Sequence, residues 1–242
     1  MRADVVLLPR ELAPVHLQGR AVVVFDVLRA TTTMTAALAA GVREIRIFGS
    51  VPEVLEAAVQ VAPGERPLLC GEVKCLPPPG FDLGNSPGAF SAASHFSRTL
   101  FMATTNGTRA IVAAQGAQML LAGALVNASA VARELARAAL DITLLCAGTG
   151  GEIAMEDVLG AGAVLDSLQK IAPVQIASDV ARMALRLFQA CRDQLRQTLI
   201  TCTGGENVVA VGLEADVDFA ARVDVFDVVG VVQAGPLRVV RT

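Results

Sequence analysis

The stretch AVVVFDVLRATTTMTAALAAGVREIRIF, residues 21–48, decides the fold class of this 242-residue chain. Its first five residues are apolar without a break, which is typical of a β-strand covered on both faces. Asp26 and Arg29 follow the strand, and residues 32–40 are expected to form a helix that ends at Gly41. A second apolar run closes the stretch. Strand followed by helix, repeated along a chain, is the pattern of an α/β fold.

The same alternation continues over most of the chain and predicts a three-layer α/β/α sandwich around a mostly parallel or mixed sheet. Strand-like composition returns in residues 225–241, which include a Gly-Pro turn. No linker rich in Pro, Ser or charge interrupts the pattern, so we expect a single domain over residues 1–242. The predicted strands are residues 4–8, 21–26, 44–48, 67–70, 100–103, 118–122 and 141–146, and the predicted helices are residues 32–40, 52–61, 108–115, 128–139, 155–170 and 179–196.

Composition excludes several classes of function. The formal net charge is −3, and no strongly basic region points to nucleic acid as a partner. Two histidines are too few for a three-His zinc site. The five cysteines lack C-x-x-C spacing, which predicts reduced thiols in a cytoplasmic protein. No residue between Arg109 and Arg133 is charged, but polar residues and glycines punctuate this stretch, so we expect buried core and no membrane span.

Polar clusters follow three of the predicted strands, at residues 26–33, 104–109 and 147–152. In a parallel sheet such junctions share the edge at which ligands bind. Each offers backbone N–H groups at a helix start together with hydroxyls, and two of them add Arg29 or Arg109. One junction alone could be ordinary helix capping. Three together favour a cradle for a multiply charged anion such as a phosphate ester.

Carboxylates border the same edge and add a cation to this prediction. Asp26 ends one strand, Glu156 and Asp157 begin a helix, and Glu72 and Glu152 are further candidates. Without histidine ligands, Mg²⁺ fits such oxygens best. Metal and arginine beside an anion cradle favour phosphoryl chemistry. The chain has no G-x-x-x-x-G-K-[ST] motif and no D-x-D pair after the first of these strands, so the P-loop and the commonest aspartyl-phosphate arrangement are excluded.

The longest irregular stretch, residues 71–87, contains four prolines and is longer than an ordinary connection in a compact α/β domain. Loops of this length are usually functional. We expect Asn85 and Ser86 to close the site from this loop.

Five motifs, in this order along the chain, resemble the 2-phosphosulfolactate phosphatase (ComB-type) family. They are DVLRATT at residues 26–32, PGFDLGNSP at 79–87, TTNGTRA at 104–110, NASAVA at 127–132, and CAGTGG at 146–151 with Glu156-Asp157 after it. With its flanking pattern the resemblance covers nearly the whole chain. It implies the family's own type of α/β/α fold and a Mg²⁺-dependent phosphatase. The implied reaction converts 2-phospho-3-sulfolactate to 3-sulfolactate and phosphate, a step toward coenzyme M.

A substrate with phosphate, sulfonate and carboxylate groups would need many N–H groups, at least two arginines and a metal. The residues assigned to catalysis are Asp26, Arg29, Arg109 and Glu156, those assigned to substrate binding are Thr31, Thr32, Asn85, Ser86, Thr105, Asn106, Gly107, Thr108, Gly148 and Thr149, and the metal candidates are Asp26, Glu156 and Asp157.

Two other functions stay open on the sequence alone. Cys146, at a strand end before a glycine-rich turn, could be the nucleophile of a cysteine hydrolase of the Asp/Lys/Cys type, although Lys74 and Lys170 are poorly placed to assist it. A non-catalytic anion-binding protein is the other alternative, and the carboxylates beside the cradle argue against it. The mean hydropathy of +0.55 suggests surface buried between subunits, and a homodimer is expected.

Overall fold

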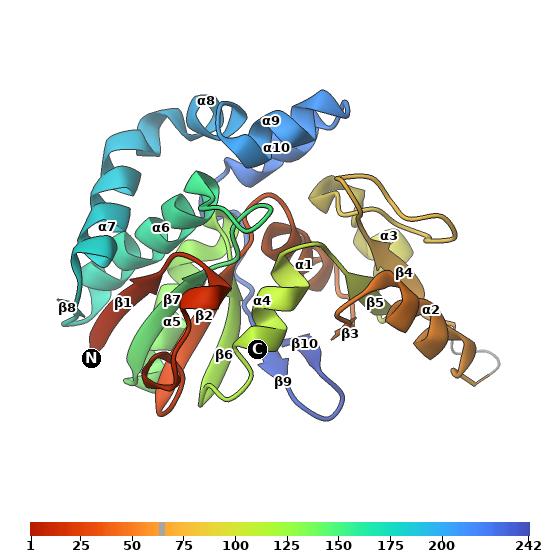
Figure 1. Cartoon of the computed structure of the whole chain (residues 1–242), viewed down its shortest axis with the longest axis horizontal. Helices are drawn as coiled ribbons and strands as arrows, with labels where there is room; N and C mark the ends of the chain where they lie inside the picture. The colour runs from red at the N-terminus through yellow and green to blue at the C-terminus, as the bar shows by residue number, and fades with distance from the viewer. Residues whose placement is uncertain (63–65) are drawn as a thin grey trace.

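The computed structural model describes residues 1–62 and 66–242. Within these residues the chain forms one ten-stranded sheet in the order β4-β5-β3-β10-β9-β6-β2-β7-β1-β8 (Figure 1). The strands are β1 Arg2–Val6, β2 Arg20–Phe25, β3 Glu44–Ile47, β4 Leu68–Gly71, β5 Thr99–Ala103, β6 Met119–Gly123, β7 Asp141–Cys146, β8 Gln175–Ile176, β9 Gly230–Gln233 and β10 Arg238–Arg241.

Helices cover both faces of this sheet and make the architecture a three-layer sandwich. The helices are α1 Ala30–Ala39, α2 Val51–Val59, α3 Ala92–His95, α4 Gly107–Ala113, α5 Ala128–Ala138, α6 Met155–Ile171, α7 Asp179–Cys191, α8 Leu195–Ile200, α9 Thr203–Ala210 and α10 Glu214–Ala220. Successive side chains of β2 point to opposite faces. Val23 and Phe25 therefore join the core under α5, α6 and α7, whereas Val22 and Val24 join the core under α1 and α4.

The sheet consists of two parallel blocks joined by an antiparallel hairpin. β4, β5 and β3 are mutually parallel, as are β6, β2, β7, β1 and β8. β9 and β10 lie between the blocks and pair antiparallel with each other, with β6 and with β3. Three successive antiparallel pairings reverse the direction of one block relative to the other. The expectation that all three polar junctions share one edge of a parallel sheet is therefore wrong for the junction after β5.

The predicted elements of the sequence are present, and most end within two residues of the expected positions. The helix predicted over residues 179–196 is interrupted by a 3-10 turn at Arg192–Gln194, which separates α7 from α8. The short elements α3 and β8 and the helices α9 and α10 were not predicted. The residues between Arg109 and Arg133 form parts of α4, β6 and α5 around buried core, as expected.

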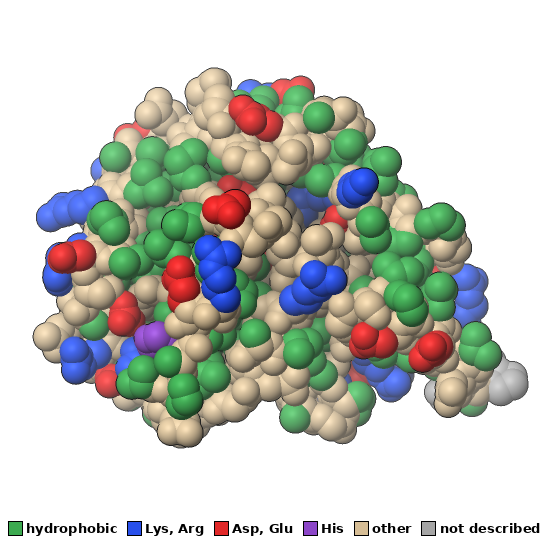
Figure 2. All heavy atoms as spheres, viewed as in Figure 1, with side chains coloured by type: hydrophobic (Ala, Val, Ile, Leu, Met, Phe, Trp, Pro, Cys, Tyr) green, Lys and Arg blue, Asp and Glu red, His purple; other side chains and the backbone are tan. Residues whose placement is uncertain are grey.

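Figure 1 shows α8, α9 and α10 running across the top of the view. They form a C-terminal helical segment that follows α7 and is anchored in the main core by buried side chains such as Leu199, Val208 and Val217. All five cysteines are free thiols. On the face drawn in Figure 2, basic and acidic side chains are interspersed, with no large patch of one sign. None of the described helices has the length and apolarity needed to cross a membrane.

Candidate active site

Residues from five separate segments line a small cavity of about 50 Å³ beyond the end of β2. All three polar junctions and the long loop contribute to it, together with helix α9. The lining residues are Asp26, Leu28, Arg29, Glu72, Cys75, Asn85, Asn106, Thr149, Gly204 and Asn207. The junctions therefore meet at one place even though one of them comes from the reversed block of the sheet.

Asp26 lies at the centre of this arrangement because β2 ends at the residue before it and α1 begins four residues after it. Its Oδ1 accepts a hydrogen bond from the backbone N–H of Ala30 at 3.1 Å. Its backbone is held by Thr31, whose hydroxyl accepts from Asp26 N and donates to Asp26 O, both at 3.0 Å. The next junction packs directly on this carboxylate, since a Cβ at Gly107 would lie 2.6 Å from Asp26 Oδ2. Only glycine fits there.

Burial is the main cause that raises the pKa of Asp26 to about 7, and the nearby carboxylates of Glu72 and Glu156 raise it further. Backbone N–H groups of Ala30 and Gly107 partly oppose this effect. Without a bound cation, the Asp26 carboxyl therefore exchanges its proton near neutral pH. A carboxyl with such a pKa in a cavity is a candidate functional group.

Glu156 and Asp157 are consecutive residues of α6, and both are buried, but their surroundings differ. Asp157 accepts hydrogen bonds through both oxygens, from Val27 N at 2.8 Å and from Gly148 N at 3.0 Å. It therefore ties the junction after β2 to the junction after β7. Burial, with the neighbouring charges of Glu156 and Asp26, raises its pKa well above the ordinary value.

The Glu156 carboxylate lies against the start of α9, where the missing side chain of Gly204 makes room for it. Burial raises its pKa, while hydrogen bonds with the side chains of Cys202 and Thr149 partly offset this effect. Its Oε2 is buried without a hydrogen-bond partner in the described chain, and the same holds for Oδ1 of Asn85. Buried polar atoms are nearly always paired, so two unpaired oxygens near one cavity point to an absent ligand.

Arg29 is buried beside Asp26 and is held in place by three acceptors. Nη1 donates to Asp216 Oδ2 at 2.6 Å and to Ser86 Oγ at 3.4 Å, and Nη2 donates to the carbonyl oxygen of Cys75 at 2.5 Å. Ser86 also donates to Asp216 Oδ2 at 2.8 Å. Of the five guanidinium donors, Nε–H and one Nη2–H have no partner in the described residues. Two adjacent nitrogens thus keep a donor each for an anion in the cavity.

The structure places the other predicted substrate-binding residues in three groups. Asn85, Asn106 and Thr149 line the cavity, and Ser86 and Gly107 contact residues that line it. The buried hydroxyls of Thr31, Thr32 and Thr108 bond to backbone atoms of their own junctions, as Gly148 N bonds to Asp157. Thr105 is exposed and donates through its backbone N–H to Glu72.

Arg109 is exposed on the first turn of α4 and forms no ion pair with any described residue. It does not line the cavity, but it lies three residues beyond Asn106, which does. Asn106 is the N-cap residue of this helix, and Arg109 belongs to the first turn that follows it.

Cys146 ends β7 and is completely buried. Burial and the charges of Asp157 and Glu156 raise the pKa of its thiol well above the ordinary value, so the sulfur stays protonated at neutral pH. It does not line the cavity. These surroundings are the opposite of those that activate a nucleophilic cysteine.

A Mg²⁺ ion fits part of this donor set. No three His, Cys, Asp or Glu side chains of the described residues are grouped closely enough to hold a metal by themselves. Mg²⁺, however, is usually held by one or two carboxylates, with substrate phosphate and water completing its shell. Glu156 Oε2 and Asn85 Oδ1 are unpaired, and Asp26 lines the cavity although it accepts backbone hydrogen bonds from Ala30 and Gly107. Asp157, in contrast, is bonded to backbone through both oxygens and does not line the cavity.

The C-terminal helical segment contributes residues to the site that were not predicted from the sequence. Gly204 and Asn207 of α9 line the cavity, and Asp216 of α10 pairs with Arg29. One local signal was available: Thr203-Gly204-Gly205 places a hydroxyl and glycines at a helix start, as the recognised junctions do. The pairing of Asp216 with Arg29 spans 187 residues and has no local signal.

Comparisons with a family model and with individual proteins point to the same family. Residues 6–235 match the family model described as 2-phosphosulpholactate phosphatase. A protein of Carboxydothermus hydrogenoformans named "Probable 2-phosphosulfolactate phosphatase" is 35% identical over 98% of this chain and 96% of its own length. Proteins with the same name from Symbiobacterium thermophilum and Deinococcus radiodurans are 38% and 40% identical, over 91% and 92% of this chain and 94% and 89% of their own.

Proposed function

This chain belongs to the 2-phosphosulpholactate phosphatase family, a family of phosphoric monoester hydrolases, and from this premise we propose that it hydrolyses 2-phospho-3-sulfolactate to 3-sulfolactate and phosphate in a Mg²⁺-dependent reaction. On this proposal the product lies on a route to coenzyme M, and the reaction takes place in the cytoplasm. The family match over residues 6–235 carries the proposal. The cavity at Asp26 supports it, because it combines a buried arginine, carboxylates and unpaired oxygens at one place.

In this proposal, Arg29 binds the phosphoryl group. Its Asp216, Ser86 and Cys75 partners fix the plane of the guanidinium and leave two donors free. A preorganised donor costs no reorganisation when charge develops during phosphoryl transfer. The amide of Asn106 and the hydroxyl of Thr149 line the same cavity and would complete the contacts to phosphoryl oxygens.

Asp26 and Glu156 would hold the metal together with the side-chain oxygen of Asn85. When bound, Mg²⁺ supplies neutralisation of the transferring phosphoryl group and a more acidic water. The raised pKa values of Asp26 and Glu156 then mean that the cation competes with protons for the same oxygens. Mg²⁺ affinity is therefore expected to fall as the pH drops below about 7.

Arg109 is proposed to bind the outer acid group of the substrate. Its guanidinium is free of ion pairs with the described residues and follows Asn106 by three residues on the same helix start. The substrate's sulfonate, projecting from the cavity, would meet this charge. Arginine is suited to such oxygens because its planar fork can bind two of them at once.

Phosphate release from synthetic 2-phospho-3-sulfolactate, measured with Mg²⁺ and then with EDTA, tests the proposal. We expect turnover that EDTA abolishes and that Cys146→Ala leaves nearly unchanged. Turnover of another phosphate ester with none of phosphosulfolactate would refute the substrate. Loss of turnover in Cys146→Ala together with indifference to EDTA would refute the metal-dependent mechanism in favour of the cysteine hydrolase.

A further inference from the structure

The substrate of the proposed reaction carries three acid groups, and only two of them have a partner so far. On the proposed function, on which this inference rests, Arg29 binds the phosphoryl group and Arg109 binds the sulfonate. The third group is a carboxylate. It is bonded directly to the carbon that carries the phosphate ester, so its partner must lie close to the phosphoryl site.

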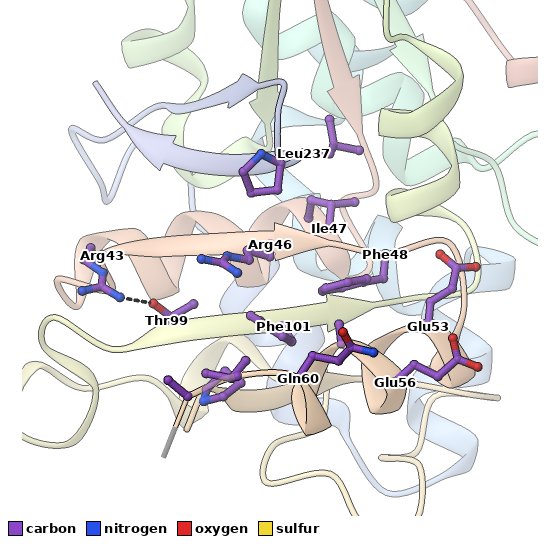
Figure 3. A pocket seen from close by; sticks show the side chains of 15 residues that line it. Arg43, Arg46, Ile47, Phe48, Glu53, Glu56, Gln60, Thr99, Phe101 and Leu237 are labelled. Atoms are coloured by element: carbon purple, nitrogen blue, oxygen red, sulfur yellow. Dashed lines mark hydrogen bonds between the residues drawn. The ribbon is translucent and has the colours of Figure 1, made fainter. Parts of the chain in front are cut away.

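A larger pocket of the described chain lies apart from this site. It is a groove of about 720 Å³ between α2 and the sheet, with Arg43 towards one end and Glu56 towards the other (Figure 3). The groove shares no lining residue with the cavity at Asp26. Its arginines are therefore not available to a carboxylate next to the bound phosphoryl group, and the partner has to come from the cavity at Asp26 itself.

Helix α9 forms a wall of this cavity. Gly204 and Asn207 both line the cavity, and because they are three residues apart they lie on one face of the helix. Gly204 is buried and makes room for the Glu156 carboxylate, whereas Asn207 is exposed. This face of α9 therefore runs from a proposed metal ligand outward to a side-chain amide at the mouth of the cavity.

The amide of Asn207 is the free donor among the lining side chains to which no role has been given. Leu28 is apolar, and the thiol of Cys75 is a weak donor. Glu72 is an anion, and its two oxygens already accept from Cys75 N at 2.9 Å and from Thr105 N at 2.7 Å. Asn207 forms no side-chain hydrogen bond with the described residues, and its NH₂ group can donate two.

From these features we propose that Asn207 donates a hydrogen bond to the carboxylate of the substrate and is a specificity-determining residue of the site. The lengths of the two outer arms support this assignment. The carboxylate is attached to the ester carbon itself, whereas the sulfonate lies one carbon further out. Asn207 lines the cavity, whereas Arg109 lies beyond its lining on the first turn of α4. The shorter arm thus meets α9, and the longer arm meets α4.

Steady-state kinetics with three phosphate esters tests this assignment. 2-Phospho-3-sulfolactate carries both outer groups, 2-phosphooxyethanesulfonate lacks only the carboxylate, and 2-phospholactate lacks only the sulfonate. Asn207→Ala should lower kcat/KM about tenfold for the two esters that carry the carboxylate, because a hydrogen bond to a charged group is lost. The same variant should change kcat/KM less than about threefold for 2-phosphooxyethanesulfonate, which has no carboxylate to bind.

A second variant and a matched control separate this contact from general effects. Asn207→Asp should lower the preference for 2-phospho-3-sulfolactate over 2-phosphooxyethanesulfonate at least as much as Asn207→Ala, because it sets two carboxylates against each other. Glu206→Gln changes the adjacent exposed residue of α9, which does not line the cavity, and should leave kcat/KM for all three esters within about twofold of the wild type.

The outcomes distinguish this inference from the proposed function. Turnover of 2-phospho-3-sulfolactate by the wild type, with Asn207→Ala losing equally on all three esters or on none, would overturn the inference and leave the proposed function in place. A wild type that hydrolyses none of the three esters would refute the proposed function and this inference with it.

Discussion

Replacing Asp26 by asparagine is expected to remove the pH dependence of stability that this carboxyl causes. Its pKa of about 7, compared with 3.8 when unperturbed, means that the folded protein disfavours the ionised form by roughly 4 kcal/mol. A group whose pKa is raised in the folded state contributes stability below its unfolded pKa, and this is lost as the pH rises through the folded value. For Asp26 the loss therefore falls between about pH 4 and pH 8.

The quantity to measure is the difference in free energy of unfolding between Asp26→Asn and the wild type, in EDTA. Over the interval from about pH 5 to about pH 8 the variant should gain about 2–3 kcal/mol relative to the wild type. Glu156 and Asp157 also have raised pKa values, but they are present in both proteins, so the difference mainly reports Asp26. Urea unfolding followed by far-UV circular dichroism is suitable, because the chain contains no Trp or Tyr for fluorescence.

Adding Mg²⁺ at about pH 8 should then stabilise the wild type and leave Asp26→Asn unchanged, because a ligand that binds only the folded state stabilises it. Asp179→Asn, at an exposed carboxylate on α7 that pairs with Arg182, is the matched control and should be stabilised by Mg²⁺ as the wild type is. A difference between Asp26→Asn and the wild type that stays constant with pH would refute the reasoning from burial. Equal stabilisation of both proteins by Mg²⁺ would refute the assignment of Asp26 to the metal.

Three further predictions concern residues around the same cavity. Arg109→Ala should raise KM about tenfold for 2-phospho-3-sulfolactate and less than about threefold for 2-phospholactate, because only the first carries the outer sulfonate. Gly204→Ala should abolish Mg²⁺ binding and turnover, since a Cβ there would collide with the Glu156 carboxylate. Asp216→Ala should lower the free energy of unfolding by about 3–5 kcal/mol, because it leaves Arg29 buried without its counter-charge.

Matched variants control two of these predictions, and the comparison of two substrates controls the third. Gly88→Ala adds a methyl group at ordinary contact distance from Phe219 and should leave Mg²⁺ binding unchanged. Asp218→Asn removes a half-exposed partner of Arg196 on the same helix as Asp216 and should cost less than about 1 kcal/mol. Equal effects of Asp216→Ala and Asp218→Asn would contradict the view that burial decides the cost. An equal rise in KM for both substrates would contradict the placement of Arg109 at the sulfonate.

The sequence predicted the parts of the site that are encoded locally. The run from Asp26 to Thr33 ends a strand and starts a helix, and its hydroxyl and backbone bonds are made within that run. The same holds for Thr104 and Thr108, which bond to each other across one turn. Such clusters can be recognised because their physical cause lies in adjacent residues. Their meeting at one cavity was also expected, although the assumed parallel sheet was not the reason.

Long-range pairing could not be predicted in the same way. The hairpin of β9 and β10 enters the middle of the sheet and reverses one parallel block, yet its sequence reads only as two short apolar runs around a turn. Asp216 looks like an ordinary acidic residue of a short helix, and its burial against Arg29 depends on where the C-terminal helical segment folds back. No periodicity or spacing within residues 195–220 contains that information.

Glu156 and Asp157 show most clearly what a sequence pattern leaves undetermined. Both were expected to bind the metal, because two carboxylates at the start of a helix beside an anion cradle suit Mg²⁺. Consecutive helical residues, however, point about 100° apart. In the structure one carboxylate accepts two backbone N–H groups, and the other keeps an unpaired oxygen. Substitution of Asp157 should therefore detach the junction after β2 from the junction after β7. Substitution of Glu156 should leave these two junctions joined but deprive the cation of this ligand.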